Sequence, residues 1–367
     1  MVYNWQLKDW PDFSYNSSAI EDLLLDAITK ISLLTGGLNE VTEENKLETV
    51  IRVMISEALK SSAIEGENLS EEAVYSSVRN HFGIKPRVKV QDRSAEAISE
   101  IIVDAYKTYE EPLSKKQLNH WHSILCADAK SIVVGSYRKH KEAMQVISGY
   151  VGKTKVHFEA PPSSALANEM KNFITWFNAT APGKAQEIKA APLRAAIAHL
   201  YFESIHPYED GNGRLGRIIA EKALSQTMGF PIAISLSQEI EAKKKLYYQA
   251  LEQAQKSNEI TEWLVYFLNL LISAVETTQK ILNFILSKSK FFERHQDQLN
   301  PRQVKVIKRM FEEGPGGFKG GMNASKYMKI SKCSKATATR DLADLLTQKV
   351  FKKLEAGGRS TSYVLSL

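Results

Sequence analysis

The sequence predicts a mainly α-helical protein that contains one β-hairpin and ends in a winged-helix domain. In most segments of the first 290 residues, the apolar side chains recur at helical spacing. Residues 144–162, MQVISGYVGKTKVHFEAPP, are instead rich in β-branched residues and glycine, and they predict a hairpin or flap. After residue 300, three helical patterns precede two β-type runs, which is the order of a winged helix-turn-helix.

The helical pattern is interrupted often enough to divide it into separate helices. Ser17 or Ser18 is a suitable N-cap for the first helix, and the pair Gly36 and Gly37 suits its C-terminal end. Thr42 and two following acids open the second helix. The charged stretch 288–300 predicts a linker. The expected helices before it are 17–37, 42–67, 92–109, 114–126, 164–178, 192–205, 213–228, 237–256 and 260–288.

Composition indicates a globular protein without a membrane span. The chain has 367 residues, of which 43% are apolar, enough for two or three domains with sizeable cores. Its start lacks the pattern of a signal peptide, and its most apolar stretch, 263–275, is shorter than the ~20 residues that a membrane span needs. Cys126 and Cys333 have no disulfide or metal-type spacing, so a reducing compartment, the cytoplasm, is expected.

Positive charge is concentrated at the C-terminal end. Residues 301–367 hold fourteen Lys and Arg against five Asp and Glu, a net charge of +9, so the rest of the chain carries −3 of the total of +6. A basic module of this kind is typical of DNA binding through the third helix, with Lys335, Thr337, Thr339 and Arg340 as groove contacts. Winged helices also dock proteins, and a basic domain need not bind DNA, so both alternatives stay open.

The stretch HPYEDGNGRLGR places Arg214 and Arg217 at the start of a predicted helix. A helix N-terminus carries partial positive charge and unpaired N–H groups, and it disfavours bases. The two arginines share one face, and the Gly-Asn-Gly loop 211–213 lets backbone amides approach a ligand. Amides, dipole and guanidiniums together favour a polyanion such as a phosphate chain. Neutralisation of the arginines by the preceding acids is the alternative.

Two residues of the same stretch suit the chemistry of such a site. Asp210 offers the hard oxygen that Mg²⁺ prefers, and one carboxylate beside phosphates is sufficient. His206 ends a predicted helix beside Pro207, and its imidazole can deprotonate an attacking hydroxyl. A histidine at a helix end is also commonly a cap or a packed core residue.

The stretch resembles the signature of the Fic family, His-Pro-Phe-x-(Asp/Glu)-Gly-Asn-Gly-Arg-x-x-Arg, with Tyr208 in place of Phe. The resemblance extends over residues 40–290 and includes AIAHLYFESI and LYYQALEQA. It implies a Fic-type helical bundle that transfers AMP from ATP to a Ser, Thr or Tyr hydroxyl of a protein and releases pyrophosphate. The implied domains are an N-terminal helical region with an inhibitory helix (1–90), a catalytic core (91–288) and the winged helix (289–367).

The resemblance also implies roles for individual residues. His206 would be the general base and Asp210 the Mg²⁺ ligand. The phosphates would be bound by the amides of Gly211, Asn212 and Gly213, the Asn212 side chain, Arg214, and Arg217 at the γ-phosphate. The flap residues Gln145, Val146, Ile147, Ser148 and Gly149 would hold the target's backbone by strand pairing. Tyr247 and Tyr248 would lie near the adenine, although helix packing explains them equally well.

A second carboxylate, Glu65, falls on the face of the apolar stripe of its helix, as does Ser61. An inward carboxylate needs a cation, and arginine is the best partner. The alternative is that the helix ends near Ser61 and that Glu65 is solvated in a turn at Gly66. SSAIEG resembles the inhibitory motif (Ser/Thr)-x-x-x-Glu-(Gly/Asn) of self-restrained Fic proteins, which implies that Glu65 binds Arg217 and blocks the γ-phosphate.

The expected function is therefore a Mg²⁺-dependent protein adenylyltransferase held inactive by Glu65. Removal of AMP from a modified protein, with Glu65 orienting a water, needs the same groups and stays open. Transfer of phosphate or phosphocholine is disfavoured because the last glycine and second arginine of the motif are present. A nucleotide-sensing regulator that binds DNA is an alternative of another class. The target protein and a homodimeric state are not determined by the sequence.

Overall fold

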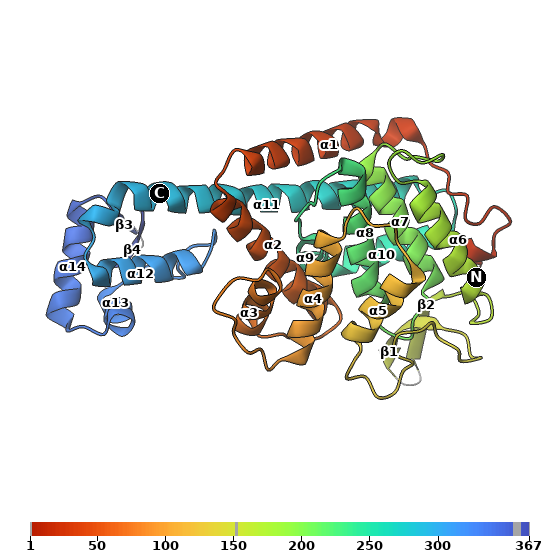
Figure 1. Cartoon of the computed structure of the whole chain (residues 1–367), viewed down its shortest axis with the longest axis horizontal. Helices are drawn as coiled ribbons and strands as arrows, with labels where there is room; N and C mark the ends of the chain where they lie inside the picture. Colours follow the sequence, from red (N-terminus) through yellow and green to blue (C-terminus); the bar gives the residue numbers. More distant parts are fainter. Residues whose placement is uncertain (1, 151–152, 355–360, 367) are drawn as a thin grey trace. The chain divides into compact units, whose positions relative to one another are not determined.

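The computed structural model describes residues 2–150, 153–354 and 361–366 (Figure 1). This part of the chain is mainly α-helical, which confirms the predicted fold class. None of its helices combines the length and the apolar character that crossing a bilayer requires. The helices are α1 (Ser17–Asn39), α2 (Glu43–Ile64), α3 (Glu71–His81), α4 (Arg93–Lys107), α5 (Lys115–Leu125), α6 (Leu166–Ala179), α7 (Ala191–Ile205), α8 (Asn212–Met228), α9 (Leu236–Ala242), α10 (Lys244–Ala254), α11 (Thr261–His295), α12 (Pro301–Glu312), α13 (Ala324–Ser331) and α14 (Lys335–Thr347).

The strands form two hairpins. β1 (Gln145–Tyr150) pairs with β2 (Lys153–Glu159) in antiparallel register, with a bulge between Val146 and Ile147, and this pair is the predicted flap. β3 (Phe351–Lys353) pairs with β4 (Tyr363–Leu365) near the C-terminal end.

One helix was missed and three expected helix boundaries were wrong. α3 was missed, α1 continues through the glycine pair, the helix 237–256 is divided at Lys243, and α11 runs through most of the predicted linker. Glycine permits a helix end but does not require one. α11 is extended by packing, because the ring of Phe291 lies 5.3 Å from that of Phe311 on α12. Such a contact is not visible in local sequence.

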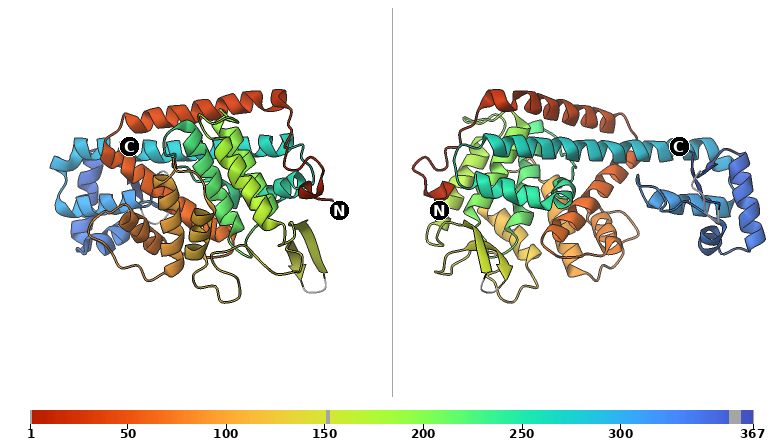
Figure 2. Two further views of the ribbon diagram at one scale, coloured as in Figure 1. Left: turned by 45° about the vertical axis from the view of Figure 1, so that its right-hand side comes forward. Right: turned by 180° about the vertical axis from the view of Figure 1, so that it is seen from behind.

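The chain divides into two compact units, which are described separately: Met1–Gly37 with Val50–Thr278, and Leu38–Thr49 with Gln279–Leu367. The three domains expected from the sequence stay a prediction. In the larger unit, all fifteen residues of α7 are buried, and α8 lies alongside α7 (Figures 1 and 2). A helix that is buried on every side is enclosed by other elements, so the α7–α8 pair lies at the centre of this unit, and the site is built on it.

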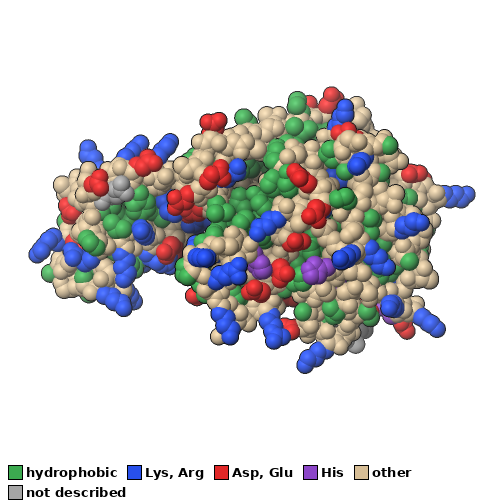
Figure 3. All heavy atoms as spheres, in the orientation of Figure 1, with side chains coloured by type: hydrophobic (Ala, Val, Ile, Leu, Met, Phe, Trp, Pro, Cys, Tyr) green, Lys and Arg blue, Asp and Glu red, His purple; other side chains and the backbone are tan. Residues whose placement is uncertain are grey.

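The smaller unit holds α12, α13, α14 and the β3–β4 hairpin around its own apolar core, which includes Phe291, Ile307, Phe311, Tyr327 and Leu345. The three helices expected after residue 300 are present, and the side chains of Asn300, Asn323 and Ser334 cap them by each accepting a backbone N–H bond. The assignment as a winged helix stays a prediction. Lysine and arginine side chains are spread over this unit on the face in Figure 3.

Candidate functional site

His206 is the first residue after α7, and its backbone is held in an uncommon conformation. Its φ and ψ of 49° and 60° lie in the left-handed region, which costs a non-glycine residue about 1–2 kcal/mol. Its N–H donates to the Phe202 carbonyl at 3.0 Å, and Pro207 prevents the helix from continuing. The chain therefore turns at His206 and leaves the imidazole at the end of the buried helix.

Arg138 stabilises this turn from outside the motif. Its buried guanidinium donates to the carbonyls of His206 at 2.9 Å and Pro161 at 2.6 Å. The backbone N–H of Arg138 donates to the Pro207 carbonyl at 3.0 Å. Burial lowers the pKa of Arg138 to about 10, although Glu209 acts in the opposite direction. Sequence reasoning missed Arg138, because a single arginine far along the chain carries no periodic signal.

The loop between His206 and α8 is held by side-chain contacts. The Asn212 side chain accepts from the Tyr208 N–H at 2.9 Å and donates to the Tyr208 carbonyl at 2.8 Å. The buried Tyr208 ring stacks on His122 at 4.1 Å, and its hydroxyl donates to Asn119 at 2.9 Å. The Asn212 side chain therefore supports the loop, and its contact with the phosphates stays a prediction.

α8 begins at Asn212, so the N–H groups of its first turn have no acceptor within the helix. Gly211 precedes it with φ +79°, a conformation that favours glycine. The Gly211 N–H donates to Asp210 Oδ1 at 2.6 Å, while Asp210 Oδ2 lies 3.6 Å from Arg214. The Asp210 side chain is 58% exposed.

Arg214 and Arg217 lie on the first turns of α8, as predicted, and both are almost completely buried. Arg217 donates to Glu65 Oε1 at 2.9 Å, and to the Ser61 hydroxyl at 2.9 and 3.1 Å. Burial alone would lower the pKa of Arg217, but the Glu65 carboxylate, with further contributions from Tyr247 and Glu57, raises it above its ordinary value. The guanidinium is therefore fully charged.

The structure brings Glu65 and Ser61 to the second arginine, as the resemblance implied. α2 ends at Ile64, so Glu65 lies in the turn before Gly66 and not within the helix. Its carboxylate nevertheless points at Arg217 and is 28% exposed. A Cβ on Gly213 would lie 2.6 Å from Glu65 Oε1, so this close approach depends on glycine at position 213.

A second ion pair joins the same turn to the first arginine. Glu67 Oε2 lies 3.0 Å from Arg214, so Glu65 and Glu67 contact the two arginines separately. Sequence reasoning missed Glu67. It lies beyond the inhibitory motif and three residues after the end of α2, and only its spacing of two residues from Glu65 could have drawn attention to it.

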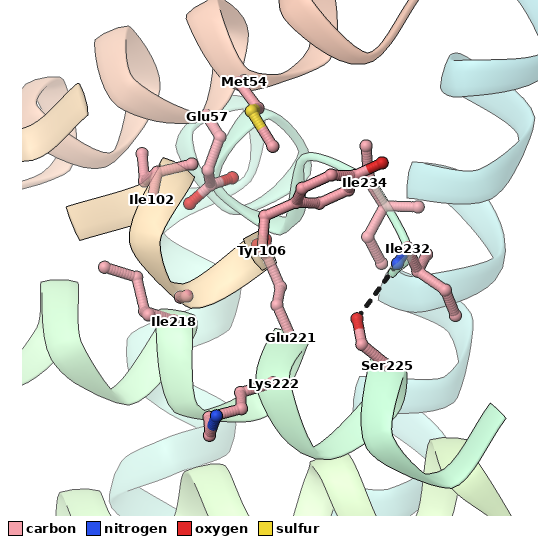
Figure 4. Close-up of a pocket in the computed structure, with 12 residues that line it drawn as sticks. Met54, Glu57, Ile102, Tyr106, Ile218, Glu221, Lys222, Ser225, Ile232 and Ile234 are labelled. Carbon is pink, nitrogen blue, oxygen red and sulfur yellow. Dashed lines mark hydrogen bonds between the residues drawn. The ribbon is translucent and has the colours of Figure 1, made fainter. Parts of the chain in front are cut away.

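α2 is anchored further along by the buried carboxylate of Glu57. Ser235 donates to it at 3.0 Å, and the backbone and hydroxyl of Ser237 donate as well. Burial raises the pKa of Glu57 in spite of these bonds. Glu57 and Glu221 lie on the wall of a cavity of about 20 Å³ between α2 and α8, which has room for one water (Figure 4).

A larger cavity of about 530 Å³ contains most of the predicted site. His206, Gly213, Arg217 and Glu65 line it. The rest of its wall comes from the flap, α7, α10 and the residues beside them: Met144, Gln145, Val146, Ile147, His157, Phe158, Glu203, Tyr247, Tyr248, Leu251, Glu252 and Gln255. The volume is within the range of pockets that hold small organic ligands.

Tyr247 and Tyr248 differ in their surroundings. Tyr247 is buried, and its hydroxyl is bonded to His199 Nε2 at 2.9 Å. Tyr248 is 39% exposed, and Lys244 Nζ lies 5.9 Å from the centre of its ring. Both line the cavity, and their placement near an adenine stays a prediction.

The flap is tied to α10 by Glu252. Its carboxylate lies 2.7 Å from His157 Nδ1 and 3.5 Å from Lys155 Nζ, both on β2, and 3.0 Å from Lys256. The hydrogen bond from His157 lowers the pKa of Glu252 to about 2, with burial acting against it and Lys256 acting with it. The Ser148 side chain lies outside the described residues, whereas Val146 and Ile147 line the cavity.

Within the described ranges, no group of three or more His, Cys, Asp or Glu residues is arranged to hold a metal ion. Asp210 uses Oδ1 to accept from the Gly211 N–H, and its role as a Mg²⁺ ligand stays a prediction. A single carboxylate suits Mg²⁺ where phosphate oxygens and waters supply the other ligands.

Comparison with known proteins agrees with this geometry. Residues 112–224 match the Fic/DOC family, and residues 3–84 match a domain of unknown function, DUF4172. Residues 112–224 of the chain are a Fic domain. This Fic protein shares its fold with a Fic family protein from Desulfovibrio desulfuricans G20, with a TM-score of 0.53 and 20% identity over 94% of this chain and 96% of that one.

Two curated relatives are similar to this Fic protein over about two thirds of its length. It is 26% identical over 251 residues to a probable protein adenylyltransferase of Aquifex aeolicus, and the matched region covers 65% of this chain and 68% of the relative. It is 26% identical over 243 residues to the protein adenylyltransferase Fic of Culex quinquefasciatus, which covers 64% of this chain but only 42% of the relative.

Proposed function

We propose that this Fic protein transfers AMP from ATP to a serine, threonine or tyrosine hydroxyl of a protein and releases pyrophosphate. Its relatives from Aquifex and Culex carry the name protein adenylyltransferase. The observation that carries the proposal is that an imidazole, a buried arginine and the N-terminus of α8 surround one cavity of about 530 Å³.

His206 is the proposed general base. Its Nδ1 is buried, so the part of the ring that lines the cavity carries Nε2. Nε2 accepts the proton of the target hydroxyl as the oxygen forms a bond to the α-phosphorus of ATP. The bond from that phosphorus to the bridging oxygen breaks, and the electron pair leaves with pyrophosphate.

The start of α8 is the proposed phosphate site. The free N–H groups of its first turn, the helix dipole, Arg214 and Arg217 all favour negative charge. Asp210 would hold Mg²⁺, which when bound neutralises charge on the phosphates. The flap would pin the target, because β1 pairs with β2 alone in the described sheet and a peptide strand can add to its other edge.

We further propose that Glu65 keeps the enzyme inactive. Its carboxylate forms an ion pair with Arg217, the residue expected to bind the γ-phosphate. While this ion pair is present, the γ-phosphate meets a carboxylate and an arginine that is already neutralised. Glu67 acts in the same way on Arg214.

The test is incubation of the wild-type protein, Glu65→Gly and the double variant Glu65→Gly/His206→Ala with Mg²⁺ and ATP labelled at the α-phosphate. Label should be transferred to protein by the Glu65 variant and lost when His206 is also replaced. Transfer of γ-label instead would identify a kinase and overturn the proposal. Removal of AMP stays the alternative, because Glu65 lines the cavity and can face a water there. It is tested with AMP-modified protein as substrate.

The C-terminal unit supports a second proposal, that α14 reads DNA. Ser334 caps α14, and the Lys335, Thr339 and Arg340 side chains are exposed along it. Replacing Lys335 and Arg340 with alanine should weaken binding to the DNA upstream of the gene and flatten its salt dependence. Unchanged binding, or binding to a protein alone, would contradict this role.

A further inference from the structure

Glu203 is a buried carboxylate next to His206 that none of the roles above uses. It lies one turn before His206 on α7, and Oε2 is 3.7 Å from His206 Nδ1. Its side chain is 5% exposed. Burying a carboxylate without a partner is costly, so its place beside the imidazole needs an explanation.

The groups around Glu203 indicate that it is ionised. His199 and His206 flank it on α7, Arg217 faces it from α8, and Tyr247 and Tyr248 lie toward it from α10. Burial alone would raise the pKa of Glu203, but His206, with smaller contributions from His199 and Arg217, holds it below its ordinary value. A negative charge is therefore fixed in the wall of the cavity, beside His206.

Of the two imidazoles beside Glu203, His206 is the one that can respond to this charge. Burial lowers the pKa of His199, and its Nε2 is already bonded to the Tyr247 hydroxyl. His206 reaches the cavity on one side and has Nδ1 buried on the other, without a hydrogen-bond partner in the described chain.

Gly216 makes this arrangement possible. A Cβ at this position of α8 would overlap Glu203 Oε1 and would lie 3.3 Å from His199 Nδ1. Any residue other than glycine would push the carboxylate out of its place. The glycine that precedes Arg217 in the motif thus has a packing reason that is independent of phosphate binding.

We propose that Glu203 is the positioning residue for His206. Its carboxylate faces Nδ1, favours the tautomer that carries the proton there, and leaves the Nε2 lone pair toward the cavity. When Nε2 takes the hydroxyl proton, the carboxylate stabilises the resulting imidazolium. A separation of 3.7 Å is longer than a hydrogen bond, and such contacts commonly tighten when substrate binds. The inference rests on the proposed function of His206 as base.

The experiment compares Glu203→Gln with Glu221→Gln, both in the Glu65→Gly background of the full chain. Glu221, on α8, is a matched control because its Oε1 is also buried and burial raises its pKa well above the ordinary value, so a neutral amide resembles it (Figure 4). Glu203→Gln should lower kcat for AMP transfer about 100-fold, within the range for a general base, and leave KM for ATP nearly unchanged. Glu221→Gln should keep kcat.

A second measurement does not depend on catalysis. The ¹⁵N chemical shifts of the His206 ring should report the Nδ1–H tautomer in the wild-type protein and in Glu203→Asp, and a mixture of tautomers in Glu203→Gln. The same tautomer in Glu203→Gln, or an unchanged kcat, would overturn the role of Glu203. If Glu65→Gly transfers no AMP at all, the proposed function fails, while the ring shifts still decide whether Glu203 positions His206.

Discussion

Replacing Glu65 with glycine removes the acid that competes with the γ-phosphate. Glu65 Oε1 makes one charge-assisted bond of 2.9 Å to a guanidinium that is only 1% exposed. Such a bond is worth about 1.5–3 kcal/mol, which corresponds to a change of about 10- to 150-fold in an equilibrium constant. Because Glu65 follows the end of α2, glycine there does not interrupt a helix.

The same change has an effect on stability that can be measured without a target protein. In the variant without nucleotide, Arg217 keeps its bonds to Ser61 but loses its direct carboxylate partner. A buried charge left without its partner destabilises the fold, so the thermal midpoint should fall. ATP at 100 times its Kd should stabilise the variant by about 2.7 kcal/mol and restore the midpoint.

The assay is isothermal titration of ATP with Mg²⁺ into the wild-type protein, Glu65→Gly and Glu65→Gln, followed by the labelled transfer reaction. Affinity and autotransfer should rise by about 10- to 150-fold in Glu65→Gly. Glu65→Gln should give a smaller rise, because its amide oxygen still accepts from Arg217 without a charge. Equal affinity and equal transfer in all three proteins would refute the competition between Glu65 and the γ-phosphate.

Three further changes test neighbouring contacts. Glu67→Gln should increase ATP affinity by releasing Arg214, and in combination with Glu65→Gly it should increase affinity further; a titration that finds no additional gain would contradict a separate role. Gly216→Ala should destabilise the protein by about 1–3 kcal/mol in urea unfolding, because the added methyl displaces Glu203; an unchanged midpoint would count against the crowding. Glu252→Gln should lower the stability of the protein at neutral pH. The pKa of Glu252 is lower in the folded protein than in the unfolded chain, so the stability that its charge contributes is lost as the pH falls from 4.5 toward about 2, and the difference from wild type should disappear over that range. A difference independent of pH would contradict the ion pairs between flap and α10.

The sequence by itself determined which chemistry to expect at the site. The identity and order of His206, Asp210, Arg214 and Arg217 within one stretch suffice to indicate a phosphate site with a base beside it, because all four are positioned by one helix end, one loop and one helix start. Helical spacing and capping residues likewise predicted most elements, since both signals are local.

Only the tertiary structure decided which distant residues complete the site. Helical periodicity did not decide whether Glu65 lies in a solvated turn or points inward as part of the helix. In the folded protein Glu65 lies in the turn after α2, and its carboxylate still contacts Arg217. Arg138, Glu67 and Glu203 reach the motif through side-chain contacts across elements or along a buried helix. Their position in the chain carries no local pattern, so the reason for each appears only when burial and distance in the folded protein are known.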